Sequence, residues 1–251
     1  MGAVAMAETL SIIIPALNER HNLDAVMRAI PVARLGRHGW DTEVVVVDNG
    51  STDGTGELAR RLGARVVDQP RRGYGNAYRA GLDSVAGGLI ATGDADRTYP
   101  FEALPELLRV LVDGGHDFLS TNRLQLKNLR ALGPSHMLAN LALSAVSRMV
   151  MGSPFRDSQS GMWLFRRRVW QAVDVRSDGM AFSQELKHEA FLKGFRCAEV
   201  PIEYRKRGGD AKLDAVRDAV RNLRQLGDHR VRYGFGPIQP ALPELPLGRS
   251  A

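Results

Sequence analysis

Apolar and polar residues alternate along the first hundred positions in two kinds of block. The first kind is short, β-branched and almost continuously apolar, as strands covered on both faces should be. These runs are residues 10–15, 43–48, 64–68 and 88–94. Amphipathic stretches separate them, at residues 22–30, 54–62 and 75–85. The β-α-β-α-β-α-β order predicts an α/β domain with a mostly parallel central sheet flanked by helices.

The same two kinds of block continue less regularly after Phe101. Further strands are predicted at residues 117–121, 161–167 and 197–204, and further helices at 101–115, 134–151, 182–193 and 211–226. We therefore predict a short N-terminal extension (residues 1–8), one large domain (9–226) and a proline-rich C-terminal tail (227–251).

Composition indicates the size of the core and the cellular compartment of this domain. The chain has 251 residues, 44% of them apolar, which is enough for a sizeable core. Its single cysteine, Cys197, excludes a disulfide framework and a cysteine-rich zinc site. No basic segment precedes the first apolar stretch, and the apolar run at 132–147 is shorter than a bilayer span, so we expect neither signal peptide nor transmembrane segment. A cytoplasmic location, with room for peripheral membrane contact, is the expectation.

The charge suggests an acidic partner. The formal charge is +6 and the pI is about 9.8, and the basic residues gather between Arg205 and Arg224. Nucleic acid, an anionic membrane surface and a phosphorylated substrate would each account for this excess. Aromatic residues are scarce in this segment, which disfavours nucleic acid.

Candidate chemistry lies where the predicted strands end, because ligands of open parallel sheets bind beyond the carboxyl ends of the strands. Three such segments carry unusual residues: PALNE (15–19), DNGSTDGT (48–55) and GDAD (93–96). Asp94 and Asp96 suit Mg²⁺ or Mn²⁺, which prefer oxygen ligands and substrate phosphates. A solvated turn is the alternative for the same two residues. Asp48 either accepts a hydrogen bond from a nucleotide base or belongs to a turn that caps the next helix.

Other catalytic templates are absent from the sequence. The glycines of residues 71–82 do not have the G-x-G-x-x-G spacing, and no G-K-[ST] phosphate loop occurs. The chain also has no H-E-x-x-H and no G-x-S-x-G motif. These absences disfavour a dinucleotide enzyme, a P-loop nucleotide hydrolase, a zinc protease and a serine hydrolase.

Six motifs in order carry a more specific resemblance. They are IIIPALNE, VVVDNGSTDGT, GYGNAYRAGL, GDAD, DSQSGMWLFRR and EVPIEYRKRGGDAKL. Over residues 9–226 the chain resembles family 2 glycosyltransferases of GT-A fold, in the branch of dolichyl-phosphate mannose synthase and bacterial polyprenyl-phosphate glycosyltransferases. The resemblance implies a single Rossmann-like GT-A domain, with residues 9–100 binding the nucleotide sugar and 101–226 binding the acceptor. It also implies metal-dependent, inverting transfer from a nucleotide-diphosphate sugar, with UDP favoured over GDP.

The resemblance also implies roles for individual residues. The nucleotide-sugar site would include Pro15, Ala16, Asn18, Glu19, Asp48, Gly75, Asp94 and Asp96. Asp96, with Asp94, would hold Mg²⁺ or Mn²⁺. Arg207 and Lys212 would lie close to phosphates, and Asp157 and Glu185 are the candidate acids for acceptor activation. Two positions depart from the family pattern: Asn49 stands where a second acid is common, and Ala211 stands where a serine is common.

The acceptor remains open between two classes. A polyprenyl phosphate is the acceptor that the resemblance implies, and a soluble natural-product or nucleoside acceptor is the alternative. A nucleotide-sugar binding protein without turnover is a further alternative, and no nucleic-acid partner is expected. The apolar stretch 137–151 and the amphipathic helix 211–226 each permit membrane contact, although packing of the second on the sheet is favoured. The oligomeric state is not predicted.

Overall fold

The computed structural model describes residues 8–209 and 215–234. Within these residues a seven-stranded sheet has the order β3-β2-β1-β4-β6-β5-β7. The strands are β1 (Glu8–Ala16), β2 (Trp40–Asp48), β3 (Arg65–Asp68), β4 (Leu89–Thr92), β5 (Phe118–Asn122), β6 (Trp163–Arg166) and β7 (Cys197–Pro201). Each coincides with a predicted strand, and all pairs that do not involve β6 are parallel. The predicted α/β class with a mostly parallel sheet is confirmed.

Strand β6 runs against both of its neighbours. Leu164 pairs with Ala91 of β4 and with Leu119 of β5 in antiparallel registers. The start of β6 therefore lies at the same edge of the sheet as the end of β4. This reversal brings the DSQSG segment, which precedes a strand, to the edge where the other motifs follow strands.

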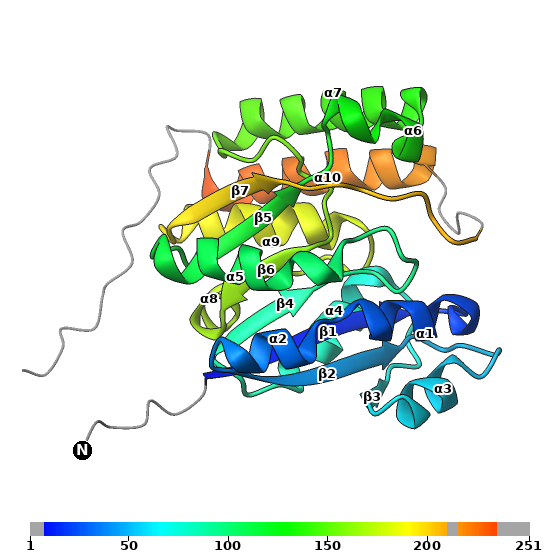
Figure 1. Cartoon of the computed structure of the whole chain (residues 1–251). Coiled ribbons are helices and arrows are strands. Elements are labelled where there is room, and N and C mark those ends of the chain that lie inside the picture. Colours follow the sequence, from blue (N-terminus) through cyan, green and yellow to red (C-terminus); the bar gives the residue numbers. More distant parts are fainter. Residues whose placement is uncertain (1–7, 210–214, 235–251) are drawn as a thin grey trace, which may run out of the picture.

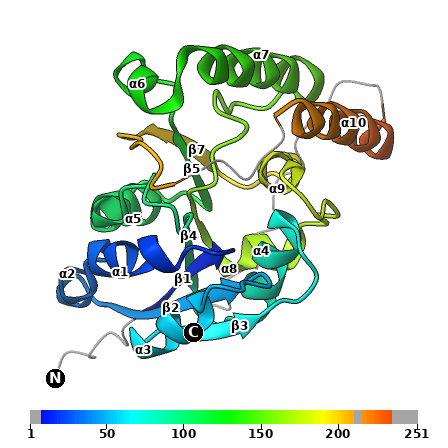
Figure 2. The same ribbon diagram turned by 90° about the vertical axis from the view of Figure 1, so that its right-hand side faces the viewer.

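Helices cover both faces of the sheet (Figure 2). Ile12 and Ile14 of β1 face one core cluster, whereas Ile13 faces the other, as the alternation of a strand requires. The first face is covered by α1 (Arg20–Ala29), α2 (Val32–Arg37), α3 (Thr55–Arg61) and α5 (Leu104–Asp113), which follows the short 3₁₀ turn Phe101–Ala103. The second face is covered by α4 (Tyr74–Asp83), α8 (Arg167–Ala172) and α9 (Ala181–Leu192).

A third layer lies outside α9. It consists of α7 (Pro134–Met151) and α10 (Ala215–Tyr233), with α6 (Leu129–Leu132) and the 3₁₀ turn Leu126–Asn128 beside α7 (Figures 1 and 2). Helix α9 is consequently buried along nearly its whole length, and its outer side is polar. Its hydrogen bonds to the outer helices run from Gln184 to Gln225 (2.7 Å) and from His188 to Ser147 (2.8 Å).

The outer layer corrects one expectation. Helix 211–226 was expected to pack on the sheet with its apolar stripe, but the described part packs on α9 and α7 instead. Because α9 presents polar groups, α10 buries Asn222, Gln225 and His229 and leaves Val220 and Leu223 exposed. The other two members of that stripe, Leu213 and Val216, lie outside the described side chains.

Several element boundaries differ from the prediction. Helix α10 continues to Tyr233, so residues 227–233, assigned to the tail, are helical. Helices α2, α6 and α8 were not expected, and α8 begins at Arg167, the last residue of the predicted strand. Among the residues that the structure describes, no helix combines the length and apolarity needed to cross a bilayer.

Candidate functional site

The first two motif segments interlock at the carboxyl edge of β1 and β2. Ala16 pairs with Asp48, and the amide of Asn49 donates to the carbonyl of Ala16 at 2.9 Å. The side-chain oxygen of Asn18 accepts a hydrogen bond from the backbone amide of Thr52 at 2.8 Å. The backbone amide of Asn18 donates to the hydroxyl of Ser51. Asn18 has a φ of 52°, an uncommon value for a residue other than glycine. Strained backbone that its surroundings hold in place is typical of functional sites.

The carboxylates Asp94 and Asp96 follow β4 at the same edge. The hydroxyls of Tyr74 and Tyr78 each donate to Asp94 Oδ1 at 3.3 Å. Asp96 is almost fully buried; its Oδ1 accepts from the Thr98 hydroxyl at 2.6 Å, and its Oδ2 pairs with Arg207 at 2.8 Å. Burial, together with the negative charge of Asp96, raises the pKa of Asp94 to about 7. The positive charge of Arg207 opposes this rise.

This pair of carboxylates fits a hard divalent cation. Both groups offer oxygen atoms. The raised pKa of Asp94 reflects its burial first and the negative charge of Asp96 second, and a bound cation would offset both costs. The part of the chain that the structure describes has no cluster of three or more His, Cys, Asp or Glu side chains. A site with two carboxylates matches Mg²⁺, which usually takes one or two of them and completes its shell with water and substrate phosphates.

Residues 205–208, around Arg207, cross the turn at 94–98 that carries the two carboxylates. The amide of Arg205 donates to the carbonyl of Thr98 at 2.9 Å, and that of Gly208 donates to the carbonyl of Asp96 at 3.0 Å. The side chain of Asn22 in turn donates to the carbonyl of Gly208. Arg207 is thereby fixed beside Asp96. Lys212, the second predicted cation, lies outside the described residues.

Asp48 and Asn49 have different tasks in the second motif. Asp48 accepts a hydrogen bond from the amide of Ser51 at 2.8 Å and lies against Gly56, where a Cβ atom would come within 2.5 Å of its carboxylate. The amide group of Asn49 donates to the carbonyls of Gln69 (3.0 Å) and Arg71 (2.9 Å), and its oxygen accepts from Gly73 at 2.8 Å. A neutral amide satisfies all three partners, whereas a carboxylate cannot donate. The loop therefore accommodates asparagine at position 49, where a second acid is common in the family.

Gly75 lies where two loops meet. A Cβ atom at Gly75 would lie 2.3 Å from the carbonyl oxygen of Ser177, so only glycine permits this approach of α4 to the 177–178 loop. Arg71 and Arg79 also pair with Asp178, at 2.6 and 3.4 Å. The 69–73 loop and the start of α4 are therefore joined to the segment before α9.

Both candidate acids for acceptor activation have their oxygens occupied. Asp157 is fully buried and accepts four hydrogen bonds, three from Arg123 (its amide, Nε and a terminal nitrogen, at 2.8–3.0 Å) and one from the amide of Gln159. Burial alone would raise the pKa of Asp157, but the charge and hydrogen bonds of Arg123 outweigh it and hold that pKa below its ordinary value. Arg123 follows β5 directly, a position at the carboxyl edge that could have identified it in the sequence.

Glu185 is 2% exposed, so its carboxylate does not face solvent. It accepts from the amides of Arg176 (3.1 Å) and Ser177 (2.8 Å) and pairs with Arg232 at 3.3 Å. A second residue that the sequence did not identify is Lys187, which donates to the carbonyl of Asp157 at 2.6 Å. Its burial lowers its pKa to about 7. Such a lysine has no sequence signal, because its burial depends on the third layer of helices.

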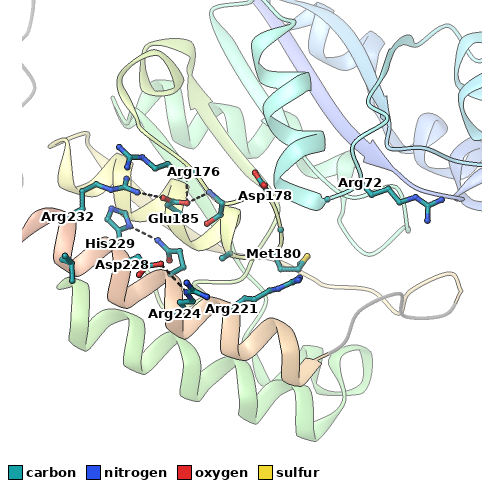
Figure 3. A pocket seen from close by; sticks show the side chains of 16 residues that line it. Arg72, Arg176, Asp178, Met180, Glu185, Arg221, Arg224, Asp228, His229 and Arg232 are labelled. Carbon is teal, nitrogen blue, oxygen red and sulfur yellow. Dashed lines mark hydrogen bonds and ion pairs between the residues drawn. The ribbon is translucent and has the colours of Figure 1, made fainter.

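A cleft of about 760 Å³ opens beside Gly73, between the 176–181 loop and α10 (Figure 3). Arg221 and Arg224 line it from α10, and Arg72 lies across from them on the 69–73 loop. Its charged lining also contains Arg176, Arg232, Asp178, Glu185 and Asp228, so arginines outnumber acids. This balance favours an anionic ligand.

Comparison with known proteins agrees with this geometry. The chain matches the family model of glycosyl transferase family 2 over residues 11–173. It is 37% identical over 221 residues to the low-salt glycan biosynthesis hexosyltransferase Agl6 of Haloferax volcanii, covering 87% of this chain and 53% of that protein. The chain thus spans about half the length of that relative.

Two other relatives are matched over most of their length. The dolichyl-phosphate hexose transferase of Haloferax volcanii is 34% identical over 82% of this chain and 87% of its own. The polyprenol monophosphomannose synthase of Mycolicibacterium smegmatis is 30% identical over 86% of each chain.

Among solved structures, glucosyl-3-phosphoglycerate synthase from Mycobacterium tuberculosis, in complex with Mn²⁺, UDP and glucosyl-3-phosphoglycerate, superimposes with a TM-score of 0.68. It is 23% identical and covers 87% of this chain and 80% of its own. That likeness concerns the fold. Together with the family match, it confirms the resemblance read from the six motifs. The chain belongs to glycosyl transferase family 2 and is a glycosyltransferase of GT-A fold, similar to the polyprenyl-phosphate branch of that family.

Proposed function

We propose that this enzyme transfers a sugar from a nucleotide-diphosphate sugar to a polyprenyl phosphate, with inversion at the anomeric carbon and with Mg²⁺ or Mn²⁺. The observation that carries the proposal is the convergence of Asp94, Asp96 and Arg207 at the carboxyl end of β4. The names of two relatives, a dolichyl-phosphate hexose transferase and a polyprenol monophosphomannose synthase, support the acceptor. UDP, present in the structural neighbour of the same fold, is the favoured donor nucleotide.

The donor would bind along the interlocked edge of β1 and β2. Pro15, Ala16, Asn18 and Glu19 would form one wall of the nucleotide pocket, and Asp48 would accept a hydrogen bond from the base or its ribose. Because these backbone segments hold each other in place, the pocket requires little ordering when the nucleotide enters. Gly75 would leave room for the approach of the donor loop to the 177–178 loop.

The diphosphate would lie against Asp94, Asp96 and Arg207. The metal ion, held by Asp96 together with Asp94, would supply positive charge to the departing nucleoside diphosphate. Arg207 would exchange part of its contact with Asp96 for a phosphate oxygen, and Lys212 would provide a second cation. Tyr74 and Tyr78 would keep the Asp94 carboxylate oriented through their hydroxyls.

Transfer would proceed as a single displacement. A phosphate oxygen of the acceptor forms the new bond to the anomeric carbon, while the bond from that carbon to the β-phosphate oxygen breaks and its electron pair leaves with the nucleoside diphosphate. A phosphate acceptor is already ionised near neutral pH, so it needs positioning more than a base. We therefore propose that Asp157 and Glu185 are positioning residues, which hold Arg123 and the 176–177 loop.

The test measures sugar transfer from UDP- and GDP-sugars to a short-chain polyprenyl phosphate with Mn²⁺. We expect Asp96→Ala to lower kcat/KM by about 10²–10³-fold, and chelation of the metal to have a similar effect. The matched control is Asp113→Ala, which removes an exposed carboxylate of α5 that pairs with Arg109 at 3.8 Å. Full activity of Asp96→Ala would refute the site. Turnover of soluble hydroxyl acceptors alone, with none of the polyprenyl phosphate, would refute the acceptor.

A further inference from the structure

Helix α7 buries polar residues and exposes apolar ones, which is the reverse of an ordinary surface helix. Its buried residues are Met137, Ser144, Ser147 and Met151. Ser147 is hydrogen-bonded to His188 of α9 at 2.8 Å, and Ser144 accepts from the amide of Ser158 at 3.0 Å. The inner side of α7 is therefore half polar, because it covers the polar outer side of α9.

The outward side of α7 is apolar. Leu138 is 69% exposed and Met149 is 84% exposed, with Leu141 and Val146 between them at helical spacing. Leu126, 89% exposed, and Leu129 extend this surface onto the adjacent 3₁₀ turn and α6. Both ribbon views show α6 and α7 side by side at one end of the molecule (Figures 1 and 2). We call Leu126, Leu129, Leu138, Leu141, Val146 and Met149 the outer face.

The charges within the segment that forms the outer face have one sign. The sequence contains no Asp or Glu from residue 118 to residue 156. Lys127, Arg130 and Arg148 are exposed within this stretch, next to members of the outer face. Large apolar side chains that are exposed together on adjacent elements mark an interaction site. An apolar face whose own segment carries exposed cations and no acid is complementary to an anionic lipid surface.

We propose that the outer face docks on an anionic membrane, with its apolar side chains in the headgroup region and Lys127, Arg130 and Arg148 against lipid phosphates. The inference rests on the proposed function, because a polyprenyl phosphate acceptor is carried by a membrane. The inner side of α7 contacts Ser158, and the neighbouring Asp157 holds Arg123 at the carboxyl edge of the sheet. Docking through α7 would thus bring the acceptor side of the enzyme to the lipid surface.

The experiment is flotation with vesicles of phosphatidylcholine containing phosphatidylglycerol, compared with vesicles of phosphatidylcholine alone. We expect the wild type to bind the anionic vesicles and the Leu138→Glu/Met149→Glu variant to bind at least about tenfold more weakly. Val32→Glu/Val110→Glu is the matched control, since it adds the same charge at exposed apolar positions of α2 and α5, 48% and 40% exposed. Unchanged thermal melting would show that all variants fold.

Two further measurements separate this inference from the proposed function. Turnover of a short, water-soluble polyprenyl phosphate should be equal in wild type and in the outer-face variant, while turnover of a long-chain acceptor in vesicles should fall with binding. Equal vesicle binding by both proteins would overturn the docking inference and leave the function intact. A wild-type dimer that the variant abolishes, without vesicle binding, would assign the outer face to a second copy and would also overturn it. Specific vesicle binding without turnover of any polyprenyl phosphate would support docking while refuting the function.

Discussion

Replacing Asp157 by asparagine tests whether this residue holds the acceptor side together. The substitution keeps the shape but removes the charge opposite Arg123, whose side chain is only 10% exposed. The Asp157 carboxylate accepts four hydrogen bonds, whereas an asparagine side chain has one accepting oxygen and would place its NH₂ group against the N–H groups of Arg123. Breaking a buried ion pair in this way costs about 3–5 kcal/mol. For a chain of this size the expected fall in Tm is about 6–20 °C.

The assay is urea unfolding at pH 7.5, followed by circular dichroism, for Asp157→Asn, Arg123→Met and the double variant. The double variant should lose less than the two single losses combined, because removing both partners leaves no buried charge. Asp113→Asn, at an exposed pair, should change stability by less than about 0.5 kcal/mol. A loss below about 1 kcal/mol in Asp157→Asn would refute the structural role.

The difference in unfolding free energy between wild type and Asp157→Asn should depend on pH with a defined sign. The folded pKa of Asp157 lies below the ordinary value of 3.8, so the unfolded chain binds its proton first as the pH falls. The stability that the carboxylate contributes is therefore complete above pH 4–5 and is lost as the pH falls through the folded pKa. The gap between wild type and Asp157→Asn should narrow in acid, and a gap that widens there would contradict the ion-pair account.

Three other substitutions have defined outcomes. Gly75→Ala places a methyl group 2.3 Å from a backbone carbonyl oxygen; it should cost about 1–3 kcal/mol in urea unfolding and weaken UDP binding by calorimetry, while Gly36→Ala, with open space around it, changes neither. Asn49→Asp, although it restores the acid common in the family, sets a carboxylate against two carbonyl oxygens and should cost about 1–3 kcal/mol. Burial holds the pKa of His188 well below 6.5, so the unfolded chain alone binds this proton and stability should fall by up to about 2 kcal/mol from pH 7.5 to pH 5; a slope that His188→Gln leaves unchanged would refute this assignment.

The sequence predicted the sheet well because its strands are buried on both faces. An unbroken β-branched run such as residues 44–47 has few other interpretations. Helices α2 and α8, each six residues long, were missed since one and a half turns do not establish a periodic pattern. The inverted outer helices were not predictable either, because their orientation follows from the polar side of α9, which is a tertiary feature.

For the site, the sequence identified the residues that follow strands. Asp94 and Asp96 were found because two acids at the end of an apolar run are conspicuous, and the antiparallel β6 then explains how DSQSG joins them. Arg123 was missed although it directly follows β5, whereas Lys187 was missed because the contact that buries it links it to Asp157, 30 residues away in the chain. Local spacing carries no information on such pairs.

The position of β6 also governs how this chain can acquire its structure. The outer edge of β4 has no partner until residues 163–166 pair with it, about seventy residues later. A fragment that stops at residue 100 would expose the edge of a strand that is fully buried in the intact sheet, which is a template for aggregation. The predicted division at residue 100 into a nucleotide-sugar half and an acceptor half therefore does not divide the sheet into two units that would fold alone. During synthesis, the donor side must wait for β6 to leave the ribosome before its sheet is complete.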